Sequence, residues 1–153
     1  MIVAIDNNIL VQLVSDRAVR NNLETFLHQN NATLLIPTPV IAEFTAFDFN
    51  KRRMQLLSYE HNKVITGVLD KKSALICGDL SYKLHKNIMN NDRQRVKVDL
   101  QIIAISLAYD AKILLSEDEG VIKSVKNLEL DLNVYSRDNI KIGLDLFDNN
   151  ETN

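Results

Sequence analysis

The stretch Ile2-Val3-Ala4-Ile5-Asp6 is the starting point for interpreting this chain of 153 residues. Residues 2–5 form a continuous apolar run, which is typical of a parallel strand that is covered on both faces. Functional groups in open parallel sheets lie beyond the carboxyl ends of the strands, so Asp6 is well placed for chemistry. Asp is also a favoured N-cap, and the alternative is that Asp6 simply begins a helix near Asn8.

A second acid, Glu43, follows the next predicted strand, residues 34–36. Thr38 suits the N-cap of a helix and Pro39 its first position, so Glu43 is predicted to lie about one turn into that helix. The apolar positions that mark the buried face of this helix are Val40, Ile41, Phe44 and Phe47. A carboxylate among them needs a partner or a cation, because burying it alone is costly. The alternative is that Glu43 lies at the edge of the stripe and points to water.

Two further acids come late in the sequence. Asp99 stands at the head of a segment that is apolar almost all round, residues 98–109, and this pattern predicts a helix that is packed on both sides. Asp99 could cap this helix, but Ser106 returns to nearly the same face two turns later, so we expect that face to point inward. Asp118 lies in an acidic loop after the predicted strand 113–115, and turns often contain such residues. Four acids at the ends of four different elements together indicate a metal site for phosphodiester chemistry.

Helix-like and strand-like patterns alternate along the chain, as they do in βα units around a parallel sheet. Further strands are predicted at residues 64–65 and 134–135. A helical stripe is formed by Ile76, Leu80, Leu84 and Ile88. We therefore predict a three-layer α/β/α fold with a central parallel sheet of four to five strands. One domain is expected to span residues 1–147, and the polar end, residues 148–153, is expected to fray.

The motifs, in this order, resemble the PIN-domain ribonucleases, and among them the toxins of bacterial toxin–antitoxin pairs. The resemblance spans most of the chain and rests on residues 5–10, 39–44, 99–108 and 114–118. It implies that four acids are catalytic and hold Mg²⁺ or Mn²⁺, namely Asp6, Glu43, Asp99 and Asp118. It also implies that Asn8 and Ser116 support these acids.

The chain departs from the family pattern at one position near the fourth acid. Many relatives carry a further acid two residues after it, and this chain has Gly120 there, with Glu117 and Glu119 beside it. The departure bears on how fully the metal site would be occupied.

Charge is nearly balanced, with a formal net charge of −2, so no global field attracts nucleic acid. RNA binding would depend on local basic patches and on a bound metal, which inverts the sign of an acidic site. The basic run beside Asp99 is the candidate for binding substrate phosphates, and it consists of Arg93, Arg95 and Lys97. Other basic residues gather at residues 51–53 and at Lys83 with Lys86. A solvated face is the alternative for each group.

Several other classes of protein are excluded. The three histidines have no metal-ligand spacing, and no phosphate-binding glycine loop or Gly-x-Ser-x-Gly motif is present. The single cysteine, Cys77, cannot form an internal disulfide. No apolar run is long enough to span a membrane, and no signal-peptide pattern is present, so we expect a soluble, cytoplasmic protein.

The resemblance implies a metal-dependent endoribonuclease that forms a homodimer and is restrained by an antitoxin protein. One alternative is a catalytically weak or inactive PIN-like module that binds nucleic acid or a protein partner. A second is a phosphotransfer domain, such as a receiver or haloacid-dehalogenase-like domain, which also has an Asp after its first strand. Such domains usually place another acid beside that Asp, whereas Asp6 is followed by Asn7 and Asn8.

Overall fold

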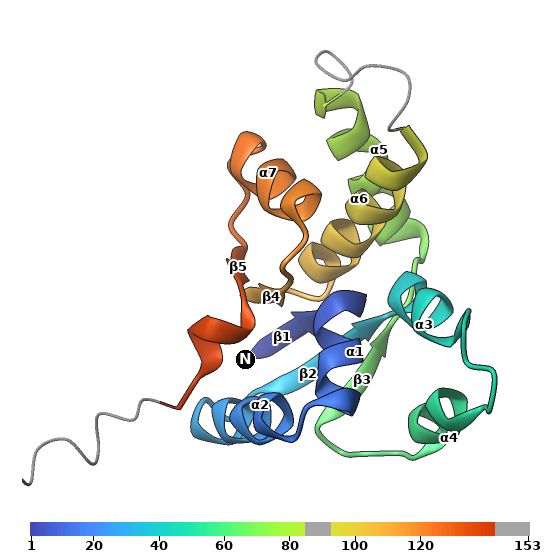
Figure 1. Cartoon of the computed structure of the whole chain (residues 1–153). Helices are drawn as coiled ribbons and strands as arrows, with labels where there is room; N and C mark the ends of the chain where they lie inside the picture. Colours follow the sequence, from blue (N-terminus) through green and yellow to red (C-terminus); the bar gives the residue numbers. More distant parts are fainter. Residues whose placement is uncertain (85–92, 143–153) are drawn as a thin grey trace, which may run out of the picture.

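The computed structural model describes residues 1–84 and 93–142. For residues 93–96 it describes the backbone but not the side chains. Five parallel strands form one sheet in the order β3-β2-β1-β4-β5 (Figure 1). The strands are β1 (Ile2–Ile5), β2 (Thr33–Pro37), β3 (Val64–Gly67), β4 (Ile113–Leu115) and β5 (Asn133–Tyr135). The predicted fold class is therefore confirmed.

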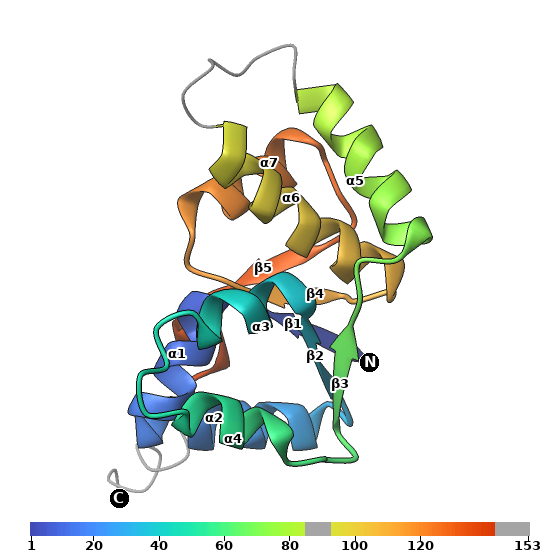
Figure 2. The same ribbon diagram turned by 90° about the vertical axis from the view of Figure 1, so that its right-hand side faces the viewer.

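Helices cover both faces of the sheet, as all-parallel sheets require. On one side lie α5 (Lys71–Leu84), α6 (Arg93–Ala108) and α7 (Glu119–Asn127), as Figure 2 shows. On the other side lie α1 (Asn7–Ser15), α2 (Arg17–Gln29) and α4 (Arg52–Ser58). The helix α3 (Thr38–Thr45) packs against both α1 and α6, and a short 3₁₀ helix, η2 (Arg137–Ile140), follows β5. No helix in the described part of the chain is long and apolar enough to cross a membrane.

The core forms around β1, the middle strand. Val3, Ala4 and Ile5 are fully buried, which explains why this strand is apolar without alternation. The helix α6 packs over the sheet with a run of buried residues, Ile102 to Ser106. This burial on successive faces agrees with the prediction of a helix packed on both sides.

The connections determine where a site can form. From β1 the chain moves outward to β2 and β3, and it then returns to the opposite side of β1 to form β4 and β5. The strand order therefore reverses between β1 and β4. Ligands of open parallel sheets bind beyond the carboxyl ends of the strands at such a point. Asp6 follows β1 and Ser116 follows β4, so both lie there.

Two local predictions were wrong, and one alternative is excluded. Thr38 is the first residue of α3 and not its cap, because Pro37 occupies the N-cap position and Pro39 still lies in the first turn, where its missing N–H costs nothing. Asp99 is no cap either, because α6 begins at Arg93. Phe47 does not belong to the buried face of α3, because it lies beyond the end of the helix and is 72% exposed. Two other predicted features, Ile88 and the end at residues 148–153, lie outside the described residues.

Candidate active site

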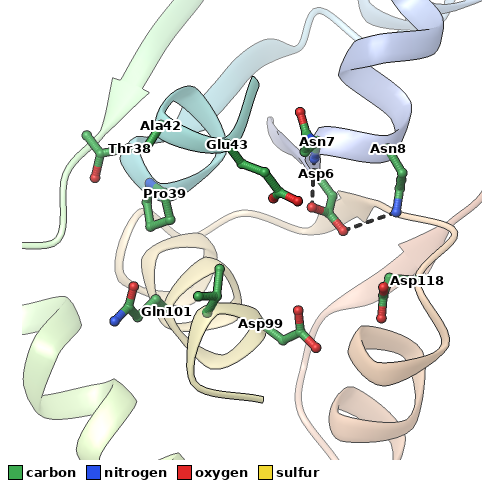
Figure 3. A pocket seen from close by; sticks show the side chains of 11 residues that line it. Asp6, Asn7, Asn8, Thr38, Pro39, Ala42, Glu43, Asp99, Gln101 and Asp118 are labelled. Atoms are coloured by element: carbon green, nitrogen blue, oxygen red, sulfur yellow. Dashed lines mark hydrogen bonds between the residues drawn. The ribbon is translucent and has the colours of Figure 1, made fainter. Parts of the chain in front are cut away.

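All four predicted acids line one pocket, which has a cavity volume of about 670 Å³. They come from four places in the fold: Asp6 after β1, Glu43 on α3, Asp99 on α6 and Asp118 at the start of α7. Figure 3 shows their side chains projecting into the pocket. The fold therefore brings together residues that are up to 112 positions apart in the sequence.

Asp6 is both the cap of α1 and the most buried of the four acids, with 6% of its surface exposed. Its Oδ1 accepts a hydrogen bond from the Asn7 backbone N–H at 2.7 Å. Its Oδ2 accepts one from Ser116 Oγ at 2.6 Å and one from Asn8 Nδ2 at 3.3 Å. The two interpretations of Asp6, as a helix cap and as a site residue, are thus compatible, because one carboxylate oxygen caps the helix while the side chain lines the pocket.

Burial raises the pKa of the Asp6 carboxyl, and this effect outweighs the hydrogen bonds from Ser116 and Asn7, which lower the pKa. The negative charge of Asp118 raises the pKa further. The pocket therefore holds a buried carboxylate whose charge is disfavoured until a positive charge joins it.

Asp118 caps α7 in the same way that Asp6 caps α1. Its Oδ1 accepts hydrogen bonds from the backbone N–H groups of Gly120 at 2.7 Å and Val121 at 3.3 Å. Its own N–H donates to Ser116 Oγ at 3.1 Å, and the same hydroxyl donates to Asp6. Ser116 therefore links the two acids, which agrees with a supporting role.

Asn8 makes the second link between the two strand ends. Its Nδ2 donates to Asp6, and its Oδ1 accepts from the Glu117 backbone N–H at 3.2 Å. Because Asn8 lies on α1 and Glu117 follows β4, this side chain fixes the distance between the elements that carry Asp6 and Asp118. Both predicted supporting residues thus contact an acid or the segment that carries one.

Glu43 and Asp99 complete the pocket from the helices α3 and α6. Glu43 is exposed and Asp99 is half-buried, and both line the pocket. Glu43 is therefore exposed, as the alternative predicted, but it is exposed at the wall of the pocket. Thr38, Asn7 and Gln101 also line this pocket, and none of them was predicted from the sequence to be a site residue.

Glu117 and Glu119 do not line the pocket. Glu117 accepts hydrogen bonds from Gln12 Nε2 at 3.2 Å and pairs with Arg137 Nε, also at 3.2 Å. Glu119 is exposed and pairs with Lys123, the residue one turn further along α7, at 3.7 Å. Neither residue replaces the acid that many relatives have at the position of Gly120.

The donor set suits a hard divalent cation, because all four acids present carboxylate oxygens. As placed, no group of three or more His, Cys, Asp and Glu side chains in the described ranges is close enough to hold one ion. Like charges repel one another, and the effect of Asp118 on the pKa of Asp6 is an instance of this repulsion.

The predicted substrate-binding residues are described only in part. Lys97 is exposed on α6, two residues before Asp99, and it is not among the residues that line the pocket. The side chains of Arg93 and Arg95 lie outside the described residues.

Comparison with solved structures identifies the fold. The chain is similar to a chain in the crystal structure of VapBC2 from Rickettsia felis bound to a promoter DNA fragment, with a TM-score of 0.64 and 20% identity over 89% of this chain and 98% of that one. The chain has a PIN-like fold. VapBC-1 from nontypeable Haemophilus influenzae gives a TM-score of 0.65 and 18% identity, covering 90% and 99% of the two chains.

A third similar structure is FitAcB from Neisseria gonorrhoeae, with a TM-score of 0.53 and 16% identity over 90% of this chain and 98% of that one. No protein-family model and no curated protein matches the sequence. The similarity therefore lies in the fold, and the four acids line one pocket of this fold.

Proposed function

We propose that this protein is a metal-dependent endoribonuclease and the toxin of a toxin–antitoxin pair. The observation that carries the proposal is the position of four carboxylates around one pocket, at the point where the strand order of a PIN-like sheet reverses. The similar structures are toxin–antitoxin complexes, which supports the assignment.

Asp6, Glu43, Asp99 and Asp118 would hold Mg²⁺ or Mn²⁺. When bound, such an ion activates a water and stabilises the negative charge that develops on the phosphate oxygens during hydrolysis. The chain's own residues prepare the site. Ser116 and Asn8 orient Asp6 by hydrogen bonds, and the cap of α7 orients Asp118. Positioned carboxylates that lose little freedom on binding are what a site of this kind requires.

A basic patch is needed to hold RNA beside an acidic pocket, and Lys97 is the described residue that we assign to it, together with Arg93 and Arg95. Because RNA is found in the cytoplasm, we place the protein there. The resemblance also implies a homodimer, and sedimentation velocity of the purified protein tests that assignment.

Purified protein incubated with single-stranded RNA provides the direct test. Cleavage is expected with Mg²⁺ or Mn²⁺ and is expected to stop when a chelator is added. An Asp6→Asn, Asp99→Asn double variant serves as the control for a contaminating nuclease. If the wild-type protein binds RNA without cleaving it under any of these metal conditions, the protein is instead a PIN-like binding module.

We further propose that the antitoxin binds beside the acidic pocket. A second hollow of about 340 Å³ lies along α1, and its apolar lining consists of Val11, Val14, Phe47 and Phe49. Val14, Phe47 and Phe49 are 40%, 72% and 94% exposed and line the same hollow, and contiguous exposed apolar side chains mark interaction sites. Asn8 on the same helix lines the acidic pocket, so the two hollows follow one another along α1. A partner segment seated on Phe49 could extend an Arg or Lys to the carboxylates.

Growth of bacteria that express the chain tests the toxin assignment. Wild-type protein is expected to arrest growth, the double variant is not, and a co-expressed antitoxin should relieve the arrest. A Phe49→Ser variant is expected to stay toxic but to escape that relief, because Phe49 lies outside the acidic pocket. Equal toxicity of the wild-type protein and the double variant, or no toxicity from either, would rule out a nuclease toxin.

A further inference from the structure

Gly120 occupies a position where glycine is not needed for the backbone. It lies in the first turn of α7, and no glycine in the described residues has a positive φ. Alanine is a better helix former than glycine, so local stability alone would favour a side chain at this position. We therefore looked for a reason for glycine in the space around it.

That space is bounded by two of the four acids. A Cβ atom added to Gly120 would lie 2.8 Å from Asp99 Oδ2 and 2.9 Å from Asp118 Oδ1, both closer than carbon and oxygen atoms can approach. The two carboxylates reach this point from different elements, because Asp99 lies on α6 and Asp118 caps α7. Both contacts are to the ends of side chains, so a methyl group would displace the carboxylates and leave the backbone in place.

We propose that Gly120 is a positioning residue for the divalent cation, because its missing side chain leaves the carboxylates of Asp99 and Asp118 the shared space in which they bind one ion. This inference rests on the proposed metal site and adds a residue to it. The clash is specific to this chain, because it depends on the placement of Asp99 and Asp118 around Gly120.

The chain supplies matched controls for a Gly120→Ala variant. Gly78 lies in α5, and a Cβ atom there would meet nothing within 4 Å. A Cβ atom on Gly67 would lie 2.6 Å from Ile105 Cγ2 and 2.9 Å from Leu35 Cδ1, which are core atoms. The three alanine substitutions therefore test a site contact, an open helix surface and a packed core.

Calorimetric titration with Mn²⁺, on protein first stripped of metal, measures the effect directly. We expect the dissociation constant of Gly120→Ala to rise about tenfold or more, while Gly78→Ala binds Mn²⁺ as the wild-type protein does. The melting temperature of metal-free Gly120→Ala should stay close to that of the wild type, because the better helix propensity of alanine offsets a weakened cap where Asp118 Oδ1 has to move. Added Mn²⁺ should raise the melting temperature of the wild type and of Gly78→Ala, but raise that of Gly120→Ala much less.

Two results would overturn the inference while leaving the proposed function intact. One is Mn²⁺ binding by Gly120→Ala within about threefold of the wild type. The other is a loss of metal-free melting temperature as large as that of Gly67→Ala, which would make the contact structural. If the wild-type protein itself binds no Mn²⁺, the proposed metal site fails, and the inference fails with it.

Discussion

Replacing Asp6 by Asn should stabilise the metal-free protein while destroying the site. The carboxylate is 6% exposed, and burial is the largest of the effects that raise its pKa. A group whose pKa is raised on folding contributes stability below its unfolded pKa, and this contribution is lost as the pH rises through the folded pKa. At neutral pH, which is above the unfolded pKa, Asp6 therefore destabilises the folded state, and asparagine removes the ionisable group.

The size of the effect follows from two opposing terms. The desolvation penalty of a buried ion amounts to several kcal/mol. Against it stand the hydrogen bonds to the charged Asp6 carboxylate, which contribute roughly 1.5–3 kcal/mol each. An asparagine would weaken them, because its amide group would face the Asn8 amide where Asn8 Nδ2 now donates to Asp6 Oδ2 at 3.3 Å. Since the net effect on the pKa is upward, the first term is larger. We expect the free energy of unfolding of metal-free Asp6→Asn to be about 1 kcal/mol higher than that of the wild type, which corresponds to roughly 2–4 °C in melting temperature for a chain of this size.

Bound metal should make the wild type more stable than Asp6→Asn, the reverse of the order expected without metal. A ligand that binds only the folded state stabilises it by about 2.7 kcal/mol when its concentration is 100 times its dissociation constant. The wild type should gain this stability from Mn²⁺, whereas Asp6→Asn should not, so the two thermal-unfolding curves should exchange places. Calorimetry or circular dichroism at pH 7, with and without Mn²⁺, measures both states.

Asp16→Asn is the matched control. Asp16 also caps a helix, with its Oδ1 accepting from the Ala18 N–H at 2.8 Å, but it is exposed and does not line the acidic pocket. Asparagine caps helices as well as aspartate does, so this variant should match the wild type in both conditions. A metal-free Asp6→Asn protein that melts below the wild type would refute the burial argument, and the absence of any reversal with Mn²⁺ would refute the metal argument.

Three further variants test separate contacts. Asp99→Asn should weaken Mn²⁺ binding about tenfold or more and abolish RNA cleavage while the fold persists, and full activity in this variant would refute the proposed mechanism. Ser116→Ala removes a hydrogen bond that lowers the pKa of Asp6, so that pKa should rise further, and an unchanged carboxyl titration measured by NMR would contradict the assigned role. Gly67→Ala forces a methyl group against Ile105 and should cost about 1–3 kcal/mol of unfolding free energy, whereas an unchanged melting temperature would show that the core can adjust.

The fold could be predicted from the sequence because its strands are simple. Residues 2–5 and 113–115 are apolar without interruption, and this pattern has few interpretations other than a strand covered on both faces. Asp6 directly follows the first of these strands, and Asp118 lies three residues after the second. The end of the sheet at which the two acids lie could therefore be predicted as well. Convergence of the four acids on one pocket depends on how the helices pack, and only the structure shows it.

The errors have a common physical cause, which is that helix ends carry weak sequence signals. The first turns of α6 are charged and polar, so the apolar pattern becomes visible only at Val98, and Asp99 therefore resembled a cap. The segment after β4 was interpreted as an acidic loop, although Asp118 caps a helix that begins at Glu119. Phe47 was assigned to a buried stripe by its spacing from Phe44, but the helix ends before it, and the spacing has no meaning beyond that point.

The residues that oppose local stability lie together in this protein. Asp6 is an ionisable group in a buried position, and Gly120 is a helix residue for which alanine would be better. Either alone could be an accident of packing, as the close contacts around Gly67 show for a glycine in the core. Both, however, lie beside the same group of acids, because Gly120 borders Asp99 and Asp118, and Asp118 is linked to Asp6 through the Ser116 hydroxyl. Natural sequences depart from local consistency mainly at functional sites, so this coincidence supports the acidic pocket independently of any resemblance to a family.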